Sequence, residues 1–369
     1  MKIAILGIRG IPANYGGFET FAEELSTRLV RRGHDVTVYG RSNNIRHPEA
    51  NYRGVRLAVL PTIPTKHLDT VAHTFLSVLH VLGQRFRGRS FDAILMCNAV
   101  NAIFCLLPRA VGIPVALNVD GIERLRKKWG PSARAVYRLS ETLATRIPSV
   151  VVTDAGVIEQ YFRQQHGTVT EMIAYGADTT RTESTATLDR LGLEPRRYFL
   201  YVSRLEPENN AHLAIEAYNA AQLDGYPLVV VGDAPYASEY IARLRALASP
   251  GVLLPGAIYG EGYRELRSHA YAWIQATEVG GTHPALLEAM GAGNCVLAKD
   301  TPEHREVLDD TGLYFDRVED LAALMRGVVD DESRVRRMRA AARSRVEALY
   351  SWDAVTEQYE ALFRRMTRQ

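Results

Sequence analysis

The sequence has few cysteines and little excess charge, and each shortage argues against a class of protein. Three of the 369 residues are cysteines (Cys97, Cys105 and Cys295), and all three stand among apolar residues. Three such cysteines do not make a disulfide framework, which favours a reducing compartment such as the cytoplasm. The formal net charge of +2 is too small to indicate a nucleic-acid partner.

Long apolar runs and several well-known site motifs are missing as well. No apolar run is long enough to span a bilayer, and the first apolar residues are too few for a signal peptide. There is no H-E-x-x-H, D-x-D or Cys/His cluster, so we expect no metal site. There is no G-x-S-x-G elbow, and the N-terminal glycines do not match G-x-G-x-x-G, which argues against nicotinamide or flavin chemistry. We therefore expect a cytoplasmic protein without a bound cofactor.

What the sequence does contain is a regular alternation of short apolar runs with helical patterns. Apolar runs such as 2–7 and 198–202 are typical of buried parallel strands, and helical spacing follows them. The alternation restarts after a stretch at 178–197 that is rich in Thr, Arg and Glu. We predict two doubly wound, Rossmann-like α/β domains, 1–190 and 191–350, with a terminal helix at 351–369 that follows a break at 350–352. In such a pair the ligand is expected in the cleft between the domains.

Two glycine loops stand where a helix would begin after a strand. Gly16 and Gly17 precede a helix predicted at 18–32. In the second half, Gly280 and Gly281 are followed by Thr282, which can cap a helix that opens at Pro284. Unpaired N–H groups and the helix dipole make such a start an anion site, and Glu288 lies about one turn further on, within reach of a sugar hydroxyl. An ordinary loop–helix–strand connection is an equally good explanation of this second stretch taken alone.

Arg204 follows the strand predicted at 198–202 and precedes Glu206 and Glu208. A guanidinium at the carboxyl end of a strand can clamp a diphosphate. A surface ion pair with either glutamate is about equally probable on this pattern alone.

Two stretches bear on contact with a membrane. The basic run 123–129 ends in Trp129 and could touch anionic headgroups, although a solvated helix face is the commoner explanation of such a run. The apolar helix 71–82 is better explained as part of the core.

Taken in order, these motifs resemble the nucleotide-sugar glycosyltransferases of the GT-B fold, specifically the large retaining family four. The resemblance covers essentially the whole chain. Its strings are 7–20 (GIRGIPANYGGFET), 118–121 (NVDG), 204–210 (RLEPENN) and 278–282 (EVGGT), together with 287–293 and the Ser-Trp pair at 351–352. The longer strings look like the bacterial subgroup of rhamnosyltransferases of polysaccharide assembly.

The resemblance implies roles for particular residues. Gly17 would bring its N–H to the donor phosphates, and Arg204 would neutralise the diphosphate leaving group without a metal. Glu288 would accept hydrogen bonds from the ribose, and the backbone from Thr282 through Pro284 and Ala285 to Leu286 would cradle the distal phosphate and sugar. Asp120 would face the reacting sugar carbon. The remaining predicted site positions are Gly16, Glu208 and Gly281 in the donor site and Glu278 and His283 at its sugar end.

Three positions depart from the family pattern. Gly280 stands where the family has a second glutamate, Asn209 replaces a lysine that accompanies the arginine, and Val119 replaces a histidine. Gly280 removes the usual contact with a sugar hydroxyl, and Asn209 weakens the neutralisation of the phosphates. Val119 removes a side chain that is common in the family's active site. Glu278 and His283 are the candidates to replace the missing glutamate.

The leading hypothesis is transfer of a hexosyl or deoxyhexosyl group from a nucleoside-diphosphate sugar to a glycan or lipid-linked acceptor. No protein nucleophile is required, since the resemblance implies that the departing phosphate helps to deprotonate the acceptor. A nucleotide-sugar epimerase of the same fold and a catalytically silent nucleotide-sugar-binding module are the alternatives. Because acceptors of the subgroup are often lipid-linked, peripheral contact with the cytoplasmic membrane is a further expectation.

Overall fold

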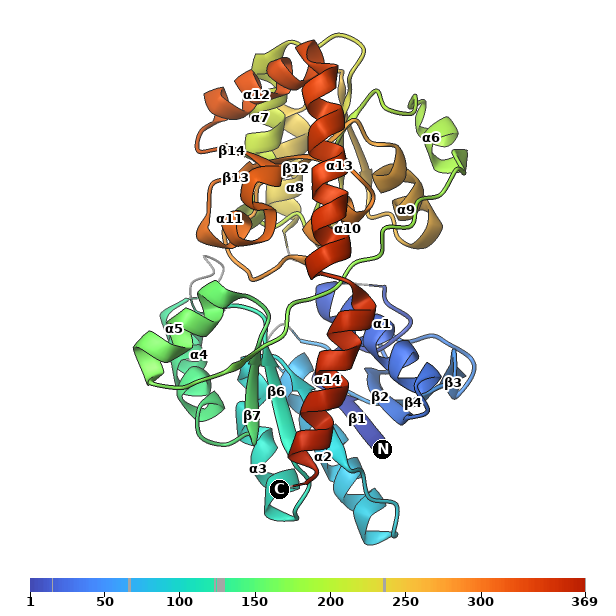
Figure 1. Ribbon diagram of the computed structural model, residues 1–369, viewed down its shortest axis with the longest axis vertical. Helices are drawn as coiled ribbons and strands as arrows, with labels where there is room; N and C mark the ends of the chain where they lie inside the picture. Colours follow the sequence, from blue (N-terminus) through green and yellow to red (C-terminus); the bar gives the residue numbers. More distant parts are fainter. Residues whose placement is uncertain (15, 66–67, 123, 125–129, 235–236, 369) are drawn as a thin grey trace. The chain divides into compact units, whose positions relative to one another are not determined.

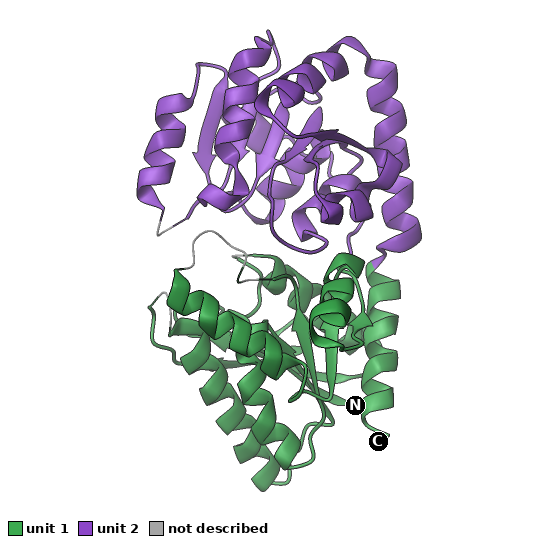
Figure 2. Cartoon of the chain, turned by 90° about the vertical axis from the view of Figure 1, so that its left-hand side faces the viewer, with its two compact units in different colours: residues 1–125, 129–175, 352–369 green, residues 126–128, 176–351 purple. Residues whose placement is uncertain are grey.

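The computed structural model describes residues 1–14, 16–65, 68–122, 124, 130–234 and 237–368 (Figure 1). Within this part of the chain, residues up to Tyr175 and from Trp352 onward make one compact unit, and Gly176–Ser351 make a second (Figure 2). Each unit is a mainly parallel sheet with helices on its faces. The predicted fold class of two Rossmann-like α/β domains is confirmed.

The sheet of the first unit has eight strands in the order β3-β4-β2-β1-β5-β6-β7-β8. They are β1 (Lys2–Leu6), β2 (Asp35–Arg41), β3 (Asn51–Tyr52), β4 (Val55–Leu60), β5 (Ala93–Cys97), β6 (Val115–Val119), β7 (Val150–Thr153) and β8 (Glu171–Met172). Neighbouring strands are parallel except the short β3–β4 pair. The strand order reverses between β1 and β5, so the loops after these two strands flank the switch point of the sheet.

Helices cover both faces of this sheet. They are α1 (Gly17–Arg31), α2 (Asp69–Phe86), η1 (Ala99–Cys105), α3 (Leu106–Ala110), α4 (Pro131–Ala144), α5 (Gly156–His166) and α14 (Trp352–Met366). Right-handed crossovers place α1 on one face and the helices that connect β4 through β8 on the other. The C-terminal α14 lies beside α1, with the ring of Phe21 5.4 Å from Tyr359 and 6.4 Å from Trp352 (Figure 1).

The second unit contains a six-stranded parallel sheet in the order β11-β10-β9-β12-β13-β14. Its strands are β9 (Phe199–Val202), β10 (Leu228–Val231), β11 (Val252–Gly256), β12 (Ala272–Gln275), β13 (Cys295–Lys299) and β14 (Gly312–Phe315). Here the order reverses between β9 and β12, so the loops after these strands flank the second switch point.

Ten helical segments accompany this sheet in the described part of the second unit. They are α6 (Ala186–Leu191), η3 (Pro207–Asn209), α7 (Ala211–Ala221), α8 (Ser238–Leu247), α9 (Gly260–His269), α10 (Pro284–Gly291), α11 (Pro302–Leu308), η4 (Asp309–Thr311), α12 (Val318–Asp330) and α13 (Glu332–Leu349). Helix α12 packs on α7, and α13 lies along α10 and β13. Gly291 of α10 closely approaches the chain at Asp178, since a Cβ there would be 2.4 Å from the carbonyl oxygen of Asp178.

The division between the units differs from the predicted one. Residues 176–190, assigned to the first domain on composition, lie in the second unit. Polar contacts attach them to α9: the Ser184 hydroxyl donates to Glu265 (2.6 Å), and Thr182 N–H donates to the Ser268 hydroxyl (3.2 Å). Hydrogen bonds, rather than packing of apolar side chains, therefore attach this segment to the second unit. The boundary between the two units lies before the segment, at residues 175–176.

The orientation of α2 is a second correction. The helix was predicted to lie in the core, and Val78 and Val81 are buried. However, Phe75 and Leu79 are each 44% exposed, while the polar His73 is buried against the sheet and contacts the Gly40 carbonyl oxygen through Nε2 at 3.0 Å. The apolar stripe of α2 therefore faces outward in part.

Other predictions also needed revision. Residues 318–349 form two helices rather than one, because the Asp331 carboxylate caps the second helix by accepting the Arg334 N–H (2.9 Å). Helices α5 and α11 and strand β14 were not predicted. In the charged run 123–129, Arg124 is described and binds Tyr161 (2.7 Å) and Glu141 (3.1 Å). The remainder of the run, including Trp129, lies outside the described residues.

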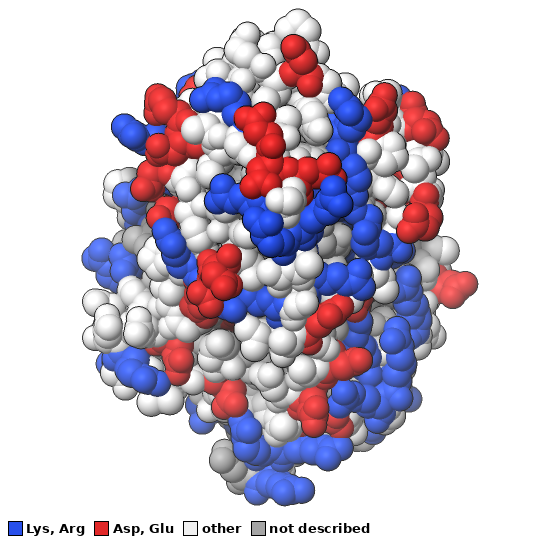
Figure 3. Space-filling view, turned by 45° about the horizontal axis from the view of Figure 1, so that its top comes forward, with Lys and Arg blue, Asp and Glu red and all other residues white. Residues whose placement is uncertain are grey.

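Positive and negative side chains are interspersed over the face of the molecule that Figure 3 shows. Among the helices of the described chain, none has the length and apolar character that a bilayer span requires.

Candidate donor site in the second unit

The loops that follow β9 and β12 lie next to each other, because these two strands pair in parallel. The first loop carries Arg204 and leads through η3 to α7, and the second carries Glu278–His283 and leads into α10. A hydrogen bond joins the loops: Asn210 Nδ2 donates to the carbonyl oxygen of Ala276 (3.0 Å). The structure thus brings the predicted second-unit residues together at the switch point of the sheet, where ligands of open α/β sheets bind.

The shape of the first loop depends on Asn209, which stands where the family pattern has a lysine. Asn209 is 5% exposed, and its Nδ2 donates to the carbonyl oxygen of Arg204 (2.7 Å). Its own carbonyl oxygen accepts the Tyr201 hydroxyl (2.6 Å). Asn209 therefore closes the loop on itself and has a structural role that sequence reasoning missed.

Arg204 projects from this loop with about a third of its side chain exposed (35%), and its Nη1 lies 3.9 Å from Glu206 Oε2. The alternative of an ion pair is thus realised with Glu206, at the outer limit of such a contact. A partly exposed ion pair of this kind contributes little to stability. Glu208, the other predicted neighbour, is 2% exposed within η3.

The second loop ends at His283, not at Thr282, the predicted helix cap. His283 occupies the position before α10 with φ of 50°, while Thr282 is 1% exposed. Pro284 has no N–H, and the Leu286 N–H donates to the His283 carbonyl oxygen (2.9 Å). Pro284 and Leu286 therefore have no backbone N–H left to donate to a phosphate. The predicted phosphate cradle thus has fewer donors than expected. Ala285, another predicted member of this cradle, lies in the first turn of α10, and Gly281, a further predicted donor-site residue, lies in the loop before it.

The sugar end of the predicted site is occupied by an imidazole pair. The rings of His283 and His304 are 5.1 Å apart. His304, on α11, is fully buried with Nδ1 2.8 Å from the carbonyl oxygen of Lys299, and burial lowers its pKa to about 4. His304 is therefore neutral near pH 7, so that Nδ1 carries a proton and donates to Lys299. Glu278 lies at the start of the same loop and is partly buried.

Glu288 is held in place by α9. Its Oε2 accepts the hydroxyl of Tyr263 (2.7 Å) and lies 3.8 Å from Nη1 of Arg267. Burial, assisted by the charge of Glu288, keeps the pKa of Tyr263 well above its usual value, so this hydroxyl stays a donor. Both contacts use Oε2, so Oε1 can accept a hydrogen bond from a ligand. Sequence reasoning missed Tyr263 and Arg267; their i, i+4 spacing is a signal only once Glu288 is known to face them.

The predicted residues of the first unit lie in the loops that follow β1 and β6. Gly16 and Gly17 stand at the start of α1, where the Glu19 carboxylate accepts the Arg9 N–H (2.9 Å) and orders the glycine loop. Burial raises the pKa of Glu19. Asp120 directly follows β6, while Val119, in place of the family's histidine, is 1% exposed in the core. The side chain of Val119 packs in the core of the first unit.

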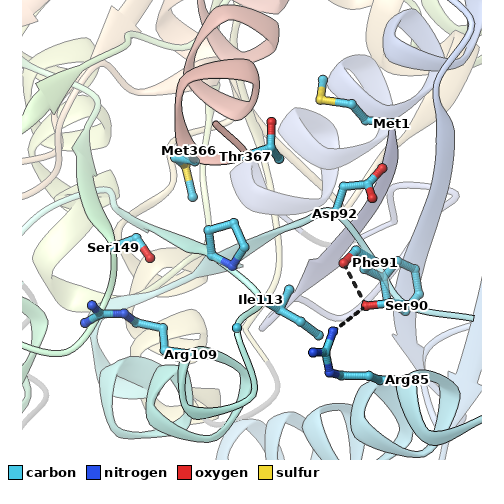
Figure 4. A pocket seen from close by; sticks show the side chains of 12 residues that line it. Met1, Arg85, Ser90, Phe91, Asp92, Arg109, Ile113, Ser149, Met366 and Thr367 are labelled. Carbon is cyan, nitrogen blue, oxygen red and sulfur yellow. Dashed lines mark hydrogen bonds between the residues drawn. The ribbon is translucent and has the colours of Figure 1, made fainter. Parts of the chain in front are cut away.

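Within the described residues no group of three His, Cys, Asp or Glu side chains has an arrangement that could hold a metal ion. A pocket of about 630 Å³ lies at the end of the first unit's sheet where β1, β5, β6 and β7 begin (Figure 4). The predicted residues of the first unit stand at the other end, where the strands finish. The lining of the pocket includes Arg85, Asp92 and Arg109 and none of the predicted site residues.

Comparison with known families divides the chain in nearly the same place as its structure. Residues 186–345 match the family described as glycosyl transferases group 1, and residues 1–178 match a domain of unknown function, DUF1972. The match to the glycosyl transferases group 1 model thus covers most of the second unit.

Individual proteins are similar to this chain over nearly its whole length. A glycogen synthase of Mycobacterium tuberculosis (strain CDC 1551 / Oshkosh) is 26% identical across 96% of this chain and 92% of its own length. Sucrose-phosphate synthase from Thermosynechococcus elongatus has a TM-score of 0.82 at 18% identity, covering 99% of this chain and 98% of that one. Anabaena HepE in complex with UDP and glucose has a TM-score of 0.79 at 17% identity, covering 99% of each chain. The two solved structures share the GT-B fold with this protein.

Proposed function

We propose that this protein transfers a hexosyl or deoxyhexosyl group, with rhamnosyl as one candidate, from a nucleoside-diphosphate sugar to a hydroxyl group. The acceptor would be a glycan or a lipid-linked glycan. The observation that carries the proposal is that the loop of Arg204 lies beside the loop that leads into α10, at the switch point of the second unit's sheet. A fixed cation and a helix N-terminus together stabilise the negative charge that develops on a departing diphosphate.

In this proposal each part of the donor has its own partner. The diphosphate faces Arg204 and the backbone before and within the first turn of α10, and the ribose hydroxyls donate to Glu288. The donor sugar lies near His283 and Glu278. The binding of UDP and glucose by HepE makes UDP-sugars the first donors to test. The roles of Gly17 and Asp120, in the first unit, stay predictions.

The proposal is tested by a thermal-shift screen against UDP, GDP and dTDP and their common sugars. A ligand present at 100 times its Kd should raise the Tm by roughly 5 °C. Donor consumption is then followed as release of the nucleoside diphosphate with candidate glycan acceptors. Isomerised donor in the absence of acceptor would indicate an epimerase, and binding without consumption would indicate a silent binding module. If no nucleotide or nucleotide sugar shifts the Tm, the proposed donor site is wrong.

A further inference from the structure

Three arginines of the second unit converge on the turn that joins α9 to β12. Arg181 precedes α6, Arg196 precedes β9 and Arg339 lies in α13, so they come from three separate parts of the chain. All three donate hydrogen bonds to the backbone of residues 268–271, and we call them the arginine cluster. Strand β12 begins at this turn, whereas the candidate donor site follows its other end. The arginine cluster therefore needs an explanation of its own.

The partners of these guanidinium groups are backbone carbonyl oxygens. Arg181 Nη2 donates to the oxygen of Ser268 (2.9 Å), and Arg196 Nη1 donates to the oxygen of Ala270 (2.9 Å). Arg339 Nη2 lies 3.4 Å from the same Ala270 oxygen. Because Arg196 and Arg339 share this one oxygen, two positively charged groups are close neighbours.

Carboxylates do not neutralise the arginine cluster. Among the residues that the structure describes, none lies close enough to Arg181, Arg196 or Arg339 to form an ion pair. Burial, and then repulsion by Arg339 and Arg181, lowers the pKa of Arg196 to about 10. The attraction by Glu183 and Glu332 is weaker than this repulsion. The cluster therefore holds positive charge that the protein itself does not offset.

The arginine cluster also has N–H groups to spare. A guanidinium has five N–H donors, and the carbonyl oxygens of the turn use only some of them. Arg339 Nε is buried and has no hydrogen-bond partner within the described chain, which is costly for a charged donor. The ring of Tyr271 lies 5.1 Å from the Arg339 guanidinium and helps to hold it in place. Arg181 is exposed, and Arg196 and Arg339 are partly buried, so the cluster is open to solvent.

The end of α9 does not by itself account for this arrangement. Carbonyl oxygens at the C-terminus of a helix attract cations, with an effect equivalent to about half an elementary negative charge. One arginine can satisfy such an end, as is common in proteins. Three full positive charges exceed what the helix end can offset, so the excess favours an anionic ligand.

We propose that the arginine cluster binds a phosphate group, either as inorganic phosphate or as part of a small phosphomonoester. Guanidinium groups form paired, charge-assisted hydrogen bonds with phosphate oxygens. A phosphate dianion would offset the excess charge and accept hydrogen bonds from the N–H groups that the turn leaves over. A carboxylate has one charge and two oxygen atoms, so it fits three guanidinium groups less well. The inference goes beyond the proposed transfer reaction and does not depend on it.

The test is calorimetric titration of the full-length protein with inorganic phosphate at constant ionic strength, with chloride as the reference anion. We expect saturable binding of phosphate and none of chloride. Arg181→Gln and Arg196→Gln/Arg339→Gln should each weaken phosphate binding by roughly tenfold or more, the loss expected for hydrogen bonds between charged groups. The matched control is Arg336→Gln, an exposed arginine of α13 whose partner is Glu332 (3.1 Å), which should bind phosphate as the wild type does.

Glycerol phosphate, with glycerol as its uncharged control, distinguishes the two sources of the phosphate group. Tighter binding of glycerol phosphate than of inorganic phosphate, with no binding of glycerol, would indicate a phosphomonoester. Equal or weaker binding of glycerol phosphate would indicate inorganic phosphate.

Three results would overturn the proposal. The first is phosphate binding no stronger than that of chloride, and the second is phosphate binding that the cluster variants leave unchanged. The third is phosphate binding that Arg204→Ala abolishes, since it would then belong to the donor site. Circular dichroism checks the fold of each variant, and Arg181→Gln decides if the double variant is unfolded, because it removes a single exposed side chain. Nucleotide binding by the cluster variants, followed by thermal shift, separates failure of this inference from failure of the proposed function.

Discussion

The imidazole ring of His283 lies over Gly280 so closely that neither residue can be considered alone. A Cβ at position 280 would be 2.3 Å from Cε1 and 2.8 Å from Nε2 of His283. A glutamate at position 280, as the wider family pattern would have, therefore requires the ring to move. The observed position of the His283 ring therefore depends on the absence of a side chain at position 280.

Gly280→Ala should displace the His283 ring and weaken donor binding by roughly tenfold, the size of effect expected for two groups in direct contact. The fold should tolerate the change, because the closest atoms belong to a side chain that can rotate. In a His283→Ala background the same alanine should have little further effect. Calorimetric Kd values for the four members of this double-mutant cycle measure the coupling, and additive effects would contradict the proposed dependence.

Arg204→Ala should reduce turnover of the donor by about 10²-fold or more, because the guanidinium is proposed to stabilise charge that develops on the leaving diphosphate. The control is Arg264→Ala, an exposed arginine of α9 whose partner is Glu261 (3.1 Å). Initial rates of nucleoside-diphosphate release distinguish the two variants. A turnover of Arg204→Ala close to that of Arg264→Ala would remove Arg204 from the mechanism.

Glu288→Ala should mainly weaken nucleotide binding, by about tenfold or more, as expected for losing hydrogen bonds to a charged acceptor. Tyr263→Phe should have a smaller effect in the same direction, since it removes the hydroxyl that orients Oε2 and leaves the carboxylate in place. Glu261→Gln, on the exposed side of the same α9, serves as control. Kd values for the nucleoside diphosphate are the measurement, and an unchanged Kd for Glu288→Ala would exclude the ribose role.

Asn209→Lys restores the family lysine, yet we expect it to lower stability without raising turnover. The substitution removes the hydrogen bond to the Arg204 carbonyl oxygen and buries a charge, which should cost roughly 1–3 kcal/mol of unfolding free energy. Urea unfolding is the measurement, with the exposed Gln165→Lys of α5 as control. Increased turnover by Asn209→Lys would show instead that position 209 can reach the diphosphate.

The sequence predicted those features that depend on local pattern. Apolar runs bounded by glycine located most strands of both sheets, and the glycine–proline–helix pattern located the start of α10 within one residue. Because strands that pair in parallel end at the same edge, the strand order then brings Arg204 beside the loop before α10.

Features that depend on side-chain direction or on partners far along the chain could not be predicted in this way. The contact of Tyr263 with Glu288, the closure of the first loop by Asn209 and the outward stripe of α2 are all of this kind. The outward stripe of α2 is the clearest case: its apolar periodicity indicates a helix, but the same periodicity does not say which side meets the sheet.

The pH dependence of stability should report the buried His304. Its pKa in the folded protein is lowered to about 4, against about 6.5 for an exposed histidine, so between these values the unfolded chain binds more protons than the folded one. This group's contribution to stability is therefore complete above pH 6.5 and declines as the pH falls towards 4, by up to about 3 kcal/mol. His304→Gln should flatten the decline in urea-unfolding free energy between pH 7 and pH 5. Equal pH slopes for the wild type and His304→Gln would show that His304 does not titrate with folding.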